Sequence, residues 1–160
     1  MAKVRWLDAE QERAWRRYRR MRTLLDLQIA RDLKRDSGLS EPDYDVLSTL
    51  SESPDGGWRA NDFAARLLWS TSRLAHQIGR MEQRGLVERH GTTDDARGAI
   101  VALTPLGRDT LDAAAPLHVE SVRRNLIDLL TPAEIKALDR IATKVVTHLA
   151  DGGTAPFAAS

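Results

Sequence analysis

The first long segment of the chain has the hydrophobic spacing of an amphipathic helix over residues 8–36. Six apolar positions recur at steps of three or four residues, which places them on one helical face: Ala14, Tyr18, Met21, Leu25, Ile29 and Leu33. Asp8 and Gln11 have the spacing of a capping box, and Ser37-Gly38 is a C-terminal stop signal. Three further apolar residues widen this face beyond what one neighbouring helix would cover: Trp15, Leu24 and Leu27.

The middle of the chain predicts three shorter helices. Ser40 opens the first, with Asp43 at the reciprocal capping position and an apolar side formed by Tyr44, Leu47 and Leu50. A turn at 54–57 and a short bridging strand at Trp58-Arg59 precede the second helix, whose apolar side holds Phe63, Ala64, Leu67 and Leu68. The third helix spans residues 71–84 behind the N-cap candidate Ser70, and its apolar side holds Leu74, Ile78 and Met81.

A β-hairpin and two more helices complete the pattern. Two extended runs, 86–90 and 99–103, flank a polar loop bounded by glycines, which is typical of a hairpin. Thr104-Pro105 starts a helix that we expect to run to about Leu130, with a bend near Pro116. A capping box at 131–134 starts the last helix, which is expected to bury Leu138, Ile141, Val145 and Leu149. Residues 151–160 are expected to form a loose tail.

The helix predicted over 71–84 separates an apolar side from a side rich in hydrogen-bond donors. Opposite Leu74 lie Ser72, Arg73, His76, Gly79 and Arg80, with Gln77 at the border. The second helix of a helix-turn-helix needs this division, because one side packs on the domain while the other presents short or forked polar groups to base edges. Gly79 costs about 1 kcal/mol relative to Ala in a helix interior. Close approach of a phosphate backbone would explain it, and an ordinary solvated surface is the alternative.

The hairpin after this helix has the position of a wing. Its loop contains Asp95-Ala96-Arg97-Gly98, in which the carboxylate can brace the guanidinium two residues later. An arginine held in this way suits a narrow minor groove, where the potential is most negative. An ordinary charged turn is the alternative.

Composition narrows the classes of function. The 160 residues include no cysteine, which excludes disulfides, thiolate zinc sites and cysteine nucleophiles. The net charge is +1, but charge is unevenly distributed: residues 1–36 are basic and residues 37–57 are acidic. All lysine or arginine positions within 58–98 are arginine. No run of about 18 apolar residues and no secretory signal are visible, so we expect a cytoplasmic protein without a membrane partner. No phosphate loop, triad or metal-ligand spacing is recognisable, so we expect no enzyme activity, cofactor or metal.

Several motifs together resemble the MarR family of winged-helix transcriptional regulators over nearly the whole chain, about residues 8–149. The segments that carry the resemblance are GLS (38–40), YDVL (44–47), SRLAHQI (72–78), RMEQRGLV (80–87), DARG (95–98), LTPLGR (103–108) and APLH (115–118). The resemblance implies a mainly α fold, with a winged helix-turn-helix core over 40–104 within a family domain at 8–150. It also implies an obligate homodimer built by helices at 8–36 and 105–150, which agrees with the wide apolar face of the first helix.

The resemblance further implies which residues meet ligands. Those expected to face the major groove of double-stranded DNA are Thr71, Ser72, Arg73, His76, Gln77 and Arg80. Arg97, braced by Asp95, is expected to reach the minor groove. Many members of the family release DNA when a small, often aromatic or anionic, molecule enters the cleft between the dimer helices and the winged domain. The candidates to contact such an effector, each of which is otherwise a core residue, are Trp15, Tyr18, Tyr44, Trp58, Trp69 and His118.

The sequence therefore favours a dimeric, sequence-specific DNA-binding regulator, a repressor that a ligand releases from an inverted-repeat operator. The alternative is a winged-helix module for protein–protein interaction that does not bind DNA. Such a module would be expected to carry acidic or bulky apolar groups on the outer side of helix 71–84. Ser72, Arg73, His76 and Arg80 argue against it.

Overall fold

The fold is that of a computed structural model, which describes residues 4–91 and 99–152. In chain order the elements are α1 (Ala9–Ser37), α2 (Glu41–Ser51), β1 (Gly57–Arg59), α3 (Ala60–Arg66), α4 (Thr71–Gln83), β2 (Val87–His90), β3 (Ile100–Leu103), α5 (Pro105–Asn125), the 3-10 turn η1 (Ile127–Leu129) and α6 (Pro132–Gly152). The expected mainly α chain with a winged helix-turn-helix is confirmed. No helix of the described ranges is long and apolar enough to cross a membrane.

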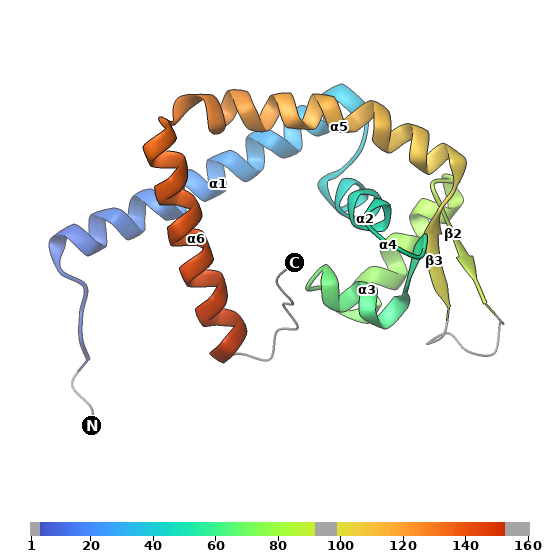
Figure 1. The fold of residues 1–160 in the computed structure, drawn as a ribbon, viewed down its shortest axis with the longest axis horizontal. Coiled ribbons are helices and arrows are strands. Elements are labelled where there is room, and N and C mark those ends of the chain that lie inside the picture. The colour runs from blue at the N-terminus through green and yellow to red at the C-terminus, as the bar shows by residue number, and fades with distance from the viewer. Residues whose placement is uncertain (1–3, 92–98, 153–160) are drawn as a thin grey trace.

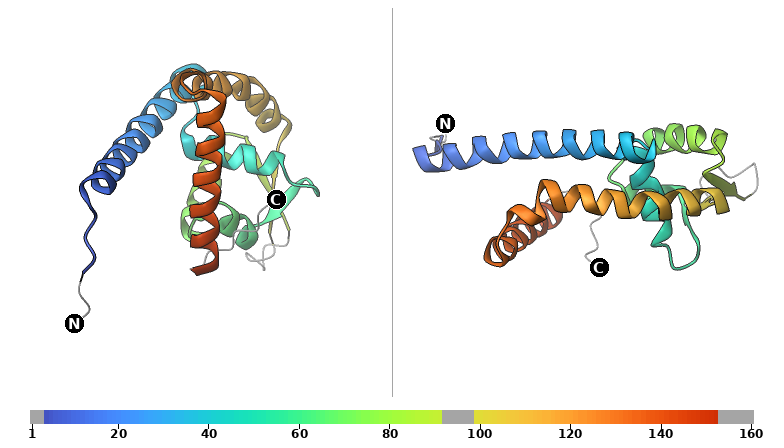
Figure 2. Two further views of the ribbon diagram at one scale, coloured as in Figure 1. Left: turned by 60° about the vertical axis from the view of Figure 1, so that its left-hand side comes forward. Right: turned by 90° about the horizontal axis from the view of Figure 1, so that it is seen from above.

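The molecule has two parts, which we call the stem and the winged core. The stem consists of α1, α5 and α6, and the winged core consists of α2, α3, α4 and a three-stranded antiparallel sheet of order β1-β3-β2 (Figure 1). Helices α1 and α5 run side by side above the winged core, and α6 turns away from the far end of α5 (Figures 1 and 2). The recognition candidate α4 therefore lies at the opposite end of the molecule from the joint between α5 and α6.

Local capping signals position the helices as the sequence predicts. The Asp8 carboxylate accepts hydrogen bonds from the backbone N–H groups of Glu10 and Gln11, both at 2.9 Å, and starts α1. Gly38 ends α1 with φ of 72°, a left-handed conformation that glycine adopts without steric cost. Thr104 starts α5 by accepting a hydrogen bond from the Gly107 backbone N–H at 3.0 Å. Gly38 and Thr104 thus fix where α1 leads into the winged core and where α5 leaves it, and Asp8 fixes the other end of α1.

The winged core has a continuous apolar interior. Its fully buried side chains come from every helix of this part and from β3: Val46, Leu47, Leu50, Phe63, Leu74, Ile78, Met81 and Val101. The bridging strand expected at Trp58-Arg59 is present, and Trp58 pairs with Val101. Helix α5 starts so close to the sheet that a Cβ at Gly107 would collide with the carbonyl oxygen of Leu86. Glycine at this position lets the stem dock against the sheet.

Three expectations about the end of the chain are wrong. Helix α5 continues through Pro116 but ends at Asn125 and not near Leu130, because Leu126 leaves the helical conformation (φ −140°, ψ −63°) and the 3-10 turn follows. Helix α6 extends to Gly152, so residues 151 and 152 do not belong to the tail, and 153–160 lie outside the described residues. The apolar side of α6 is not buried within the chain, since three of its expected core residues are mostly exposed: Ile141, Val145 and Leu149.

Candidate nucleic-acid interface

Helix α4 is held against the winged core by its apolar side. Leu74, Ile78 and Met81 are 2%, 1% and 0% exposed. Ser70 caps the helix by accepting a hydrogen bond from the Arg73 backbone N–H at 3.2 Å. The division of the helix into an inner and an outer side, predicted from residue spacing, is confirmed.

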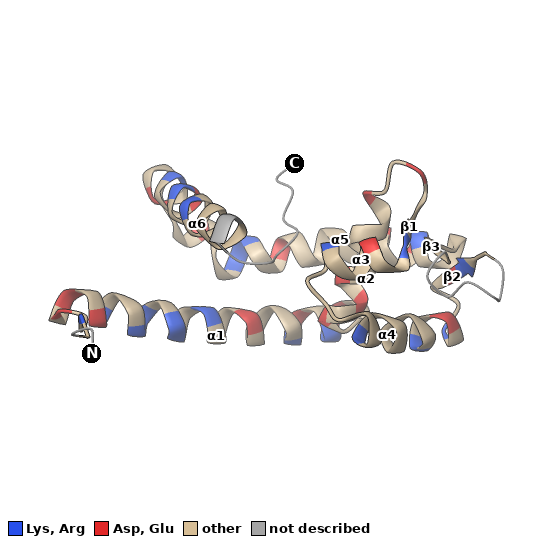
Figure 3. Ribbon diagram, turned by 90° about the horizontal axis from the view of Figure 1, so that it is seen from below, with Lys and Arg blue, Asp and Glu red and all other residues tan. Residues whose placement is uncertain are grey.

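The outer side of α4 is an open surface of hydrogen-bond donors. Five of the expected contact residues are exposed there: Thr71, Ser72, Arg73, His76 and Arg80. Nothing lies within 4 Å of the position that a Cβ would take at Gly79, so a phosphate backbone has room to approach the helix there. Figure 3 shows basic residues on α4 and a longer series of them along α1. The surface carries the charge and donor groups that suit a polyanion.

Gln77, which the residue spacing puts at the border of the helix and the family resemblance puts in the major groove, is buried instead. Its side chain is 3% exposed, because its amide nitrogen donates a hydrogen bond to Oδ1 of Asp43 at 2.8 Å. Gln77 Oε1 accepts a hydrogen bond from the Arg80 guanidinium. Gln77 therefore faces the winged core, and it touches the outer side of α4 through its hydrogen bond with Arg80.

Asp43 joins α2 to α4. Its Oδ1 accepts a second hydrogen bond, from the Arg84 guanidinium at 2.8 Å, while its Oδ2 accepts one from the Ser40 backbone N–H at 3.0 Å. Burial would raise the pKa of Asp43, but the hydrogen bonds from Ser40 and Arg84 outweigh burial and hold the pKa below its usual value. The carboxylate is thus charged at neutral pH and ties α2 to α4 and to Arg84 at the end of α4.

The turn between α3 and α4 has a strained backbone. Leu68 has φ of 55°, in the left-handed region that costs a residue other than glycine about 1–2 kcal/mol. The Trp69 backbone N–H donates to the carbonyl of Ala64 at 2.9 Å, and the Leu68 N–H donates to that of Ala65 at 3.1 Å. These two bonds form a Schellman motif, in which the left-handed position is usually a glycine. These hydrogen bonds place Trp69 immediately before Ser70, the N-cap of α4.

The wing is described only at its base. Arg89 of β2 donates a hydrogen bond to the carbonyl of Ala75 at 3.3 Å and pairs with Glu82 at 3.3 Å, so the first wing strand is attached to α4. Asp95 and Arg97, the residues expected in the minor groove, lie outside the described residues. Their placement stays a prediction.

A cavity of about 340 Å³ lies between the stem and the winged core. Two of the expected effector-binding residues line it, Tyr44 and His118, whose ring centroids are 4.3 Å apart. The buried Nδ1 of His118 has no hydrogen-bond partner among the described residues. Burial lowers the pKa of His118 and raises the pKa of Asp45, which also lines the cavity. The cavity thus offers an aromatic pair, while Nδ1 of His118 is itself buried from solvent.

The other four effector candidates do not line this cavity. Trp15 and Tyr18 stack on each other at 5.8 Å and are half exposed on the outer part of α1. Trp58 donates its indole N–H to the carbonyl of Thr49 at 3.1 Å, and Trp69 packs against the apolar interior. Each of these two tryptophans also carries a guanidinium over its ring, Arg66 at 4.7 Å from Trp58 and Arg73 at 4.1 Å from Trp69.

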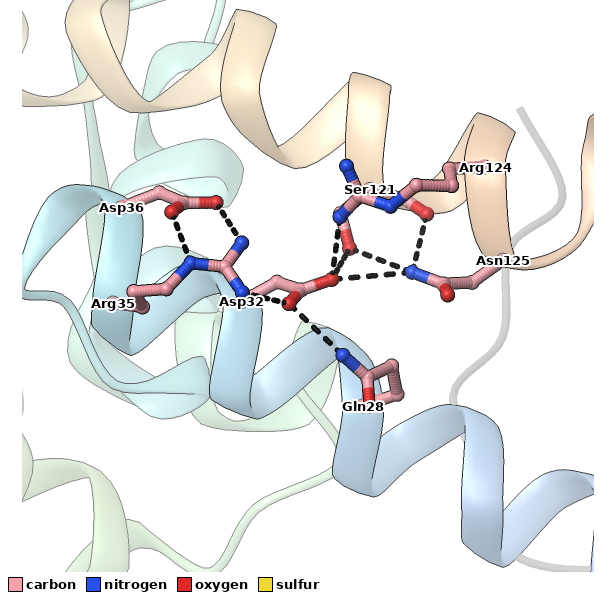
Figure 4. Close-up of polar contacts among 7 residues, drawn as sticks. All are labelled: Gln28, Asp32, Arg35, Asp36, Ser121, Arg124 and Asn125. Carbon is pink, nitrogen blue, oxygen red and sulfur yellow. Dashed lines mark hydrogen bonds and ion pairs between the residues drawn. The ribbon is translucent and has the colours of Figure 1, made fainter.

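The stem contains a buried polar cluster that the sequence did not indicate (Figure 4). Asp32 of α1 is 1% exposed and accepts five hydrogen bonds, from Gln28 (2.9 Å), Arg35 (2.8 Å), Ser121 (2.7 Å), Arg124 (2.9 Å) and Asn125 (3.1 Å). The Ser121 hydroxyl, followed by Arg124 and Arg35, holds the pKa of Asp32 far below its usual range although burial opposes the shift. Three of the five donors come from α5. The cluster therefore fastens α1 to α5.

The stem also exposes apolar side chains on two helices. On α1 they are Trp15, Tyr18, Met21, Leu24 and Leu27, each between 44% and 54% exposed. On α6 they include Ile141 (59%), Val145 (50%), Val146 (47%) and Leu149 (61%). Single exposed apolar residues are ordinary on a protein surface, but a contiguous series along a helix marks an interaction surface. No group of three or more His, Asp or Glu side chains in the described ranges is arranged to hold a metal ion.

Comparison with known proteins agrees with this architecture. A model of the MarR family matches residues 37–98. The crystal structure of AbsC, a MarR family transcriptional regulator from Streptomyces coelicolor, is 41% identical in sequence with a TM-score of 0.84, over 91% of this chain and 98% of that one. Sco3205, a MarR family regulator of the same organism solved in complex with DNA, is 36% identical with a TM-score of 0.87, over 97% of this chain and 98% of that one.

A curated relative extends the similarity beyond Streptomyces. The transcriptional regulator HosA of Escherichia coli is 27% identical over 129 residues, which are 81% of this chain and 93% of that protein. The similarity to AbsC and Sco3205 covers the stem as well as the winged core, because it spans more than nine-tenths of the chain. Its extent and identity, together with the winged helix-turn-helix built on a helical stem, show that this chain belongs to the MarR family of transcriptional regulators.

Proposed function

We propose that this chain is a sequence-specific regulator that binds double-stranded DNA by inserting α4 into the major groove. The observation that carries the proposal is the division of α4: one side is fully buried, while the other exposes Ser72, Arg73, His76 and Arg80. Side chains of this kind pair with base edges or phosphates, with arginine suited to guanine. The complex of the 36% identical Sco3205 with DNA supports the same use of the fold.

The outer residues of α4 divide by position between base and phosphate contacts. Arg73 and His76 lie near the centre of the outer side, where base edges are within reach. Arg80 lies one to two turns later and is held by Gln77, so we assign it to the phosphate backbone. Thr71 and Ser72 at the start of the helix would complete the contact, with Arg97, braced by Asp95, in the minor groove.

A homodimer would bring two copies of α4 to one DNA molecule. The exposed apolar surfaces of α1 and α6 support this assembly, because a second copy related by a two-fold axis would cover them. We therefore assign residues 40–104 to DNA binding, and residues 8–36 and 105–150 to dimerisation. Two recognition helices related by such an axis require an inverted repeat with half-sites about one helical turn apart.

A small-molecule effector would act through the cavity between the two parts of the molecule. Tyr44 and Asp45 of α2 line it, and α2 holds α4 through Asp43, so an occupant has a direct route to the recognition helix. We propose that the protein is a cytoplasmic repressor that such a ligand releases from DNA. A panel of small aromatic acids should then contain compounds that lower operator affinity, and the His118→Leu variant should not respond to them.

Selection of binding sites from random DNA tests the proposal. Wild type should enrich an inverted repeat, and Arg73→Ala and His76→Ala should change the preferred base pairs, at about 1–3 kcal/mol per lost pairing. Arg108→Ala, which removes an exposed arginine of α5, is the control and should leave the selected sequence unchanged. Failure of the wild type to enrich any sequence would favour the protein–protein interaction module instead.

A further inference from the structure

We propose that Trp69 is a positioning residue that holds Arg73 in place for base recognition before DNA binds. The inference rests on the proposed function, since it concerns an arginine that we assign to the major groove. The Arg73 guanidinium carbon lies 4.1 Å from the centroid of the Trp69 ring. Such a distance is typical of a cation–π contact.

Stacking leaves the hydrogen-bond donors of Arg73 available. A guanidinium has five N–H donors along its edge, and a ring below its face occupies none of them. Ion pairs engage donors of Arg35, Arg84 and Arg89 instead. Arg73 forms no ion pair with any residue that the structure describes. Among the described residues its donors are thus available for a base edge, while the indole lies against the guanidinium.

The indole itself is fixed. Trp69 is half-buried against the apolar interior, and its backbone N–H bond to Ala64 closes the turn after α3. Leu68 adopts its left-handed conformation to complete that turn, so the backbone is bent at the residue that precedes the indole. Ser70 follows as the N-cap of α4, and Arg73 lies four residues after Trp69. The strained turn therefore places the ring beneath Arg73.

Holding Arg73 before binding favours a specific complex over a non-specific one. A side chain that is already ordered loses less conformational freedom when it binds. Non-specific binding depends on charge and not on the orientation of the guanidinium. Loss of the indole should therefore lower affinity for the selected operator and leave affinity for unrelated DNA almost unchanged.

The test uses full-length protein and four variants: Trp69→Leu, Trp69→Phe, Arg73→Ala and the double variant of Trp69→Leu with Arg73→Ala. Affinity is measured for the operator selected by the wild type and for a scrambled duplex, and is corrected for the folded fraction. Trp69→Leu should weaken operator binding about two- to fivefold, the equivalent of an exposed cation–π contact. Trp69→Phe should retain most of the affinity because it keeps an aromatic face. In the Arg73→Ala background, Trp69→Leu should have no further effect.

Different failures have different meanings. If Arg73→Ala selects and binds the wild-type operator unchanged, the assignment of Arg73 to the groove is wrong, and with it this part of the proposed function. If Arg73→Ala changes selection but Trp69→Leu does not weaken operator binding, or weakens the scrambled duplex equally, the positioning role alone is wrong. Arg73→Lys tests the role without altering the interior: it keeps the charge but not the planar stack, and should lose operator affinity and keep scrambled-duplex affinity.

Discussion

The winged core and the stem are stabilised in different ways. The winged core closes an apolar interior within one chain, with residues such as Val46, Phe63 and Met81 fully buried. The stem joins its two long helices through a buried carboxylate, Asp32, and leaves apolar faces of α1 and α6 exposed. The difference indicates that one chain suffices to close the winged core, whereas the stem leaves apolar faces that the second copy we propose would cover.

Charges placed on α6 should have the largest effect. The double change of Ile141→Asp and Val145→Asp puts carboxylates on a surface that we expect to be buried in the dimer, where unpaired charges are strongly unfavourable. Sedimentation at micromolar concentration should show a monomer, and operator affinity should fall at least a hundredfold while α2–α4 stay folded. Thr147→Asp, on the other side of the helix, is the control and should remain dimeric. If the double variant remained dimeric, the proposal that a second copy covers the apolar face of α6 would be wrong.

Removal of the buried Asp32 carboxylate should have the second-largest effect, a loss of stability of the stem. Asp32→Ala leaves the buried Ser121 hydroxyl without its acceptor, whereas the Asn125 amide keeps the Ser121 carbonyl, and we expect a loss of about 3 kcal/mol in the free energy of unfolding. This is the low end for a broken buried ion pair, because Arg35 and Arg124 are half exposed and can bind water. Urea denaturation measures the loss. Asp36→Ala, which removes an exposed partner of Arg35, should change stability much less.

The same carboxylate sets a pH dependence. Because the pKa of Asp32 is lower in the folded state than in the unfolded state, its contribution is fully present above the unfolded value of about 3.9 and is lost as the pH falls further. The difference in stability between wild type and Asp32→Asn should thus be constant from pH 7 to pH 5 and shrink below pH 4. A difference that shrinks already between pH 7 and pH 5 would contradict this account.

Gln77 should affect stability without altering which bases are preferred. Gln77→Ala removes a buried hydrogen bond to Asp43, at a cost of about 1–3 kcal/mol. Since the amide does not reach the surface, the sequence selected from random DNA should stay that of the wild type. Gln83→Ala, an exposed neighbour on α4, provides the baseline for both measurements. A changed base preference would show that Gln77 contacts DNA after all.

Relief of strain at Leu68 should have the smallest effect. Leu68→Gly removes the steric cost of the left-handed conformation but adds conformational freedom to the unfolded chain, so the net gain in stability should be below about 1 kcal/mol. Leu68→Ala keeps the strain and is the matched control. Thermal unfolding of both variants measures the difference, and a lower melting temperature for Leu68→Gly than for Leu68→Ala would show that the strain costs less than the freedom that glycine adds to the unfolded chain.

The sequence predicted what depends on neighbouring residues and missed what depends on distant ones. The capping boxes at Asp8 and Ser40 and the apolar side of α4 follow from spacings of three or four residues, and the structure has them. Gln77 was placed wrongly because it lies at the border of the helix and its partner Asp43 is 34 residues earlier in the chain. Asp32 gave no signal for the same reason, since Ser121 is 89 residues away.

The joint between α5 and α6 has a consequence for how this protein diverges over time. Helix α6 follows the 3-10 turn and makes few contacts with the rest of its own chain. In the dimer that we propose, substitutions on α6 would therefore change which copy a subunit accepts and how far apart the two α4 helices lie, without disturbing the packing of α4. On that proposal, residues 132–152 would govern the choice of partner and residues 71–83 the choice of DNA sequence, so after a gene duplication the two products would be able to stop pairing with each other while they still bind the same sites.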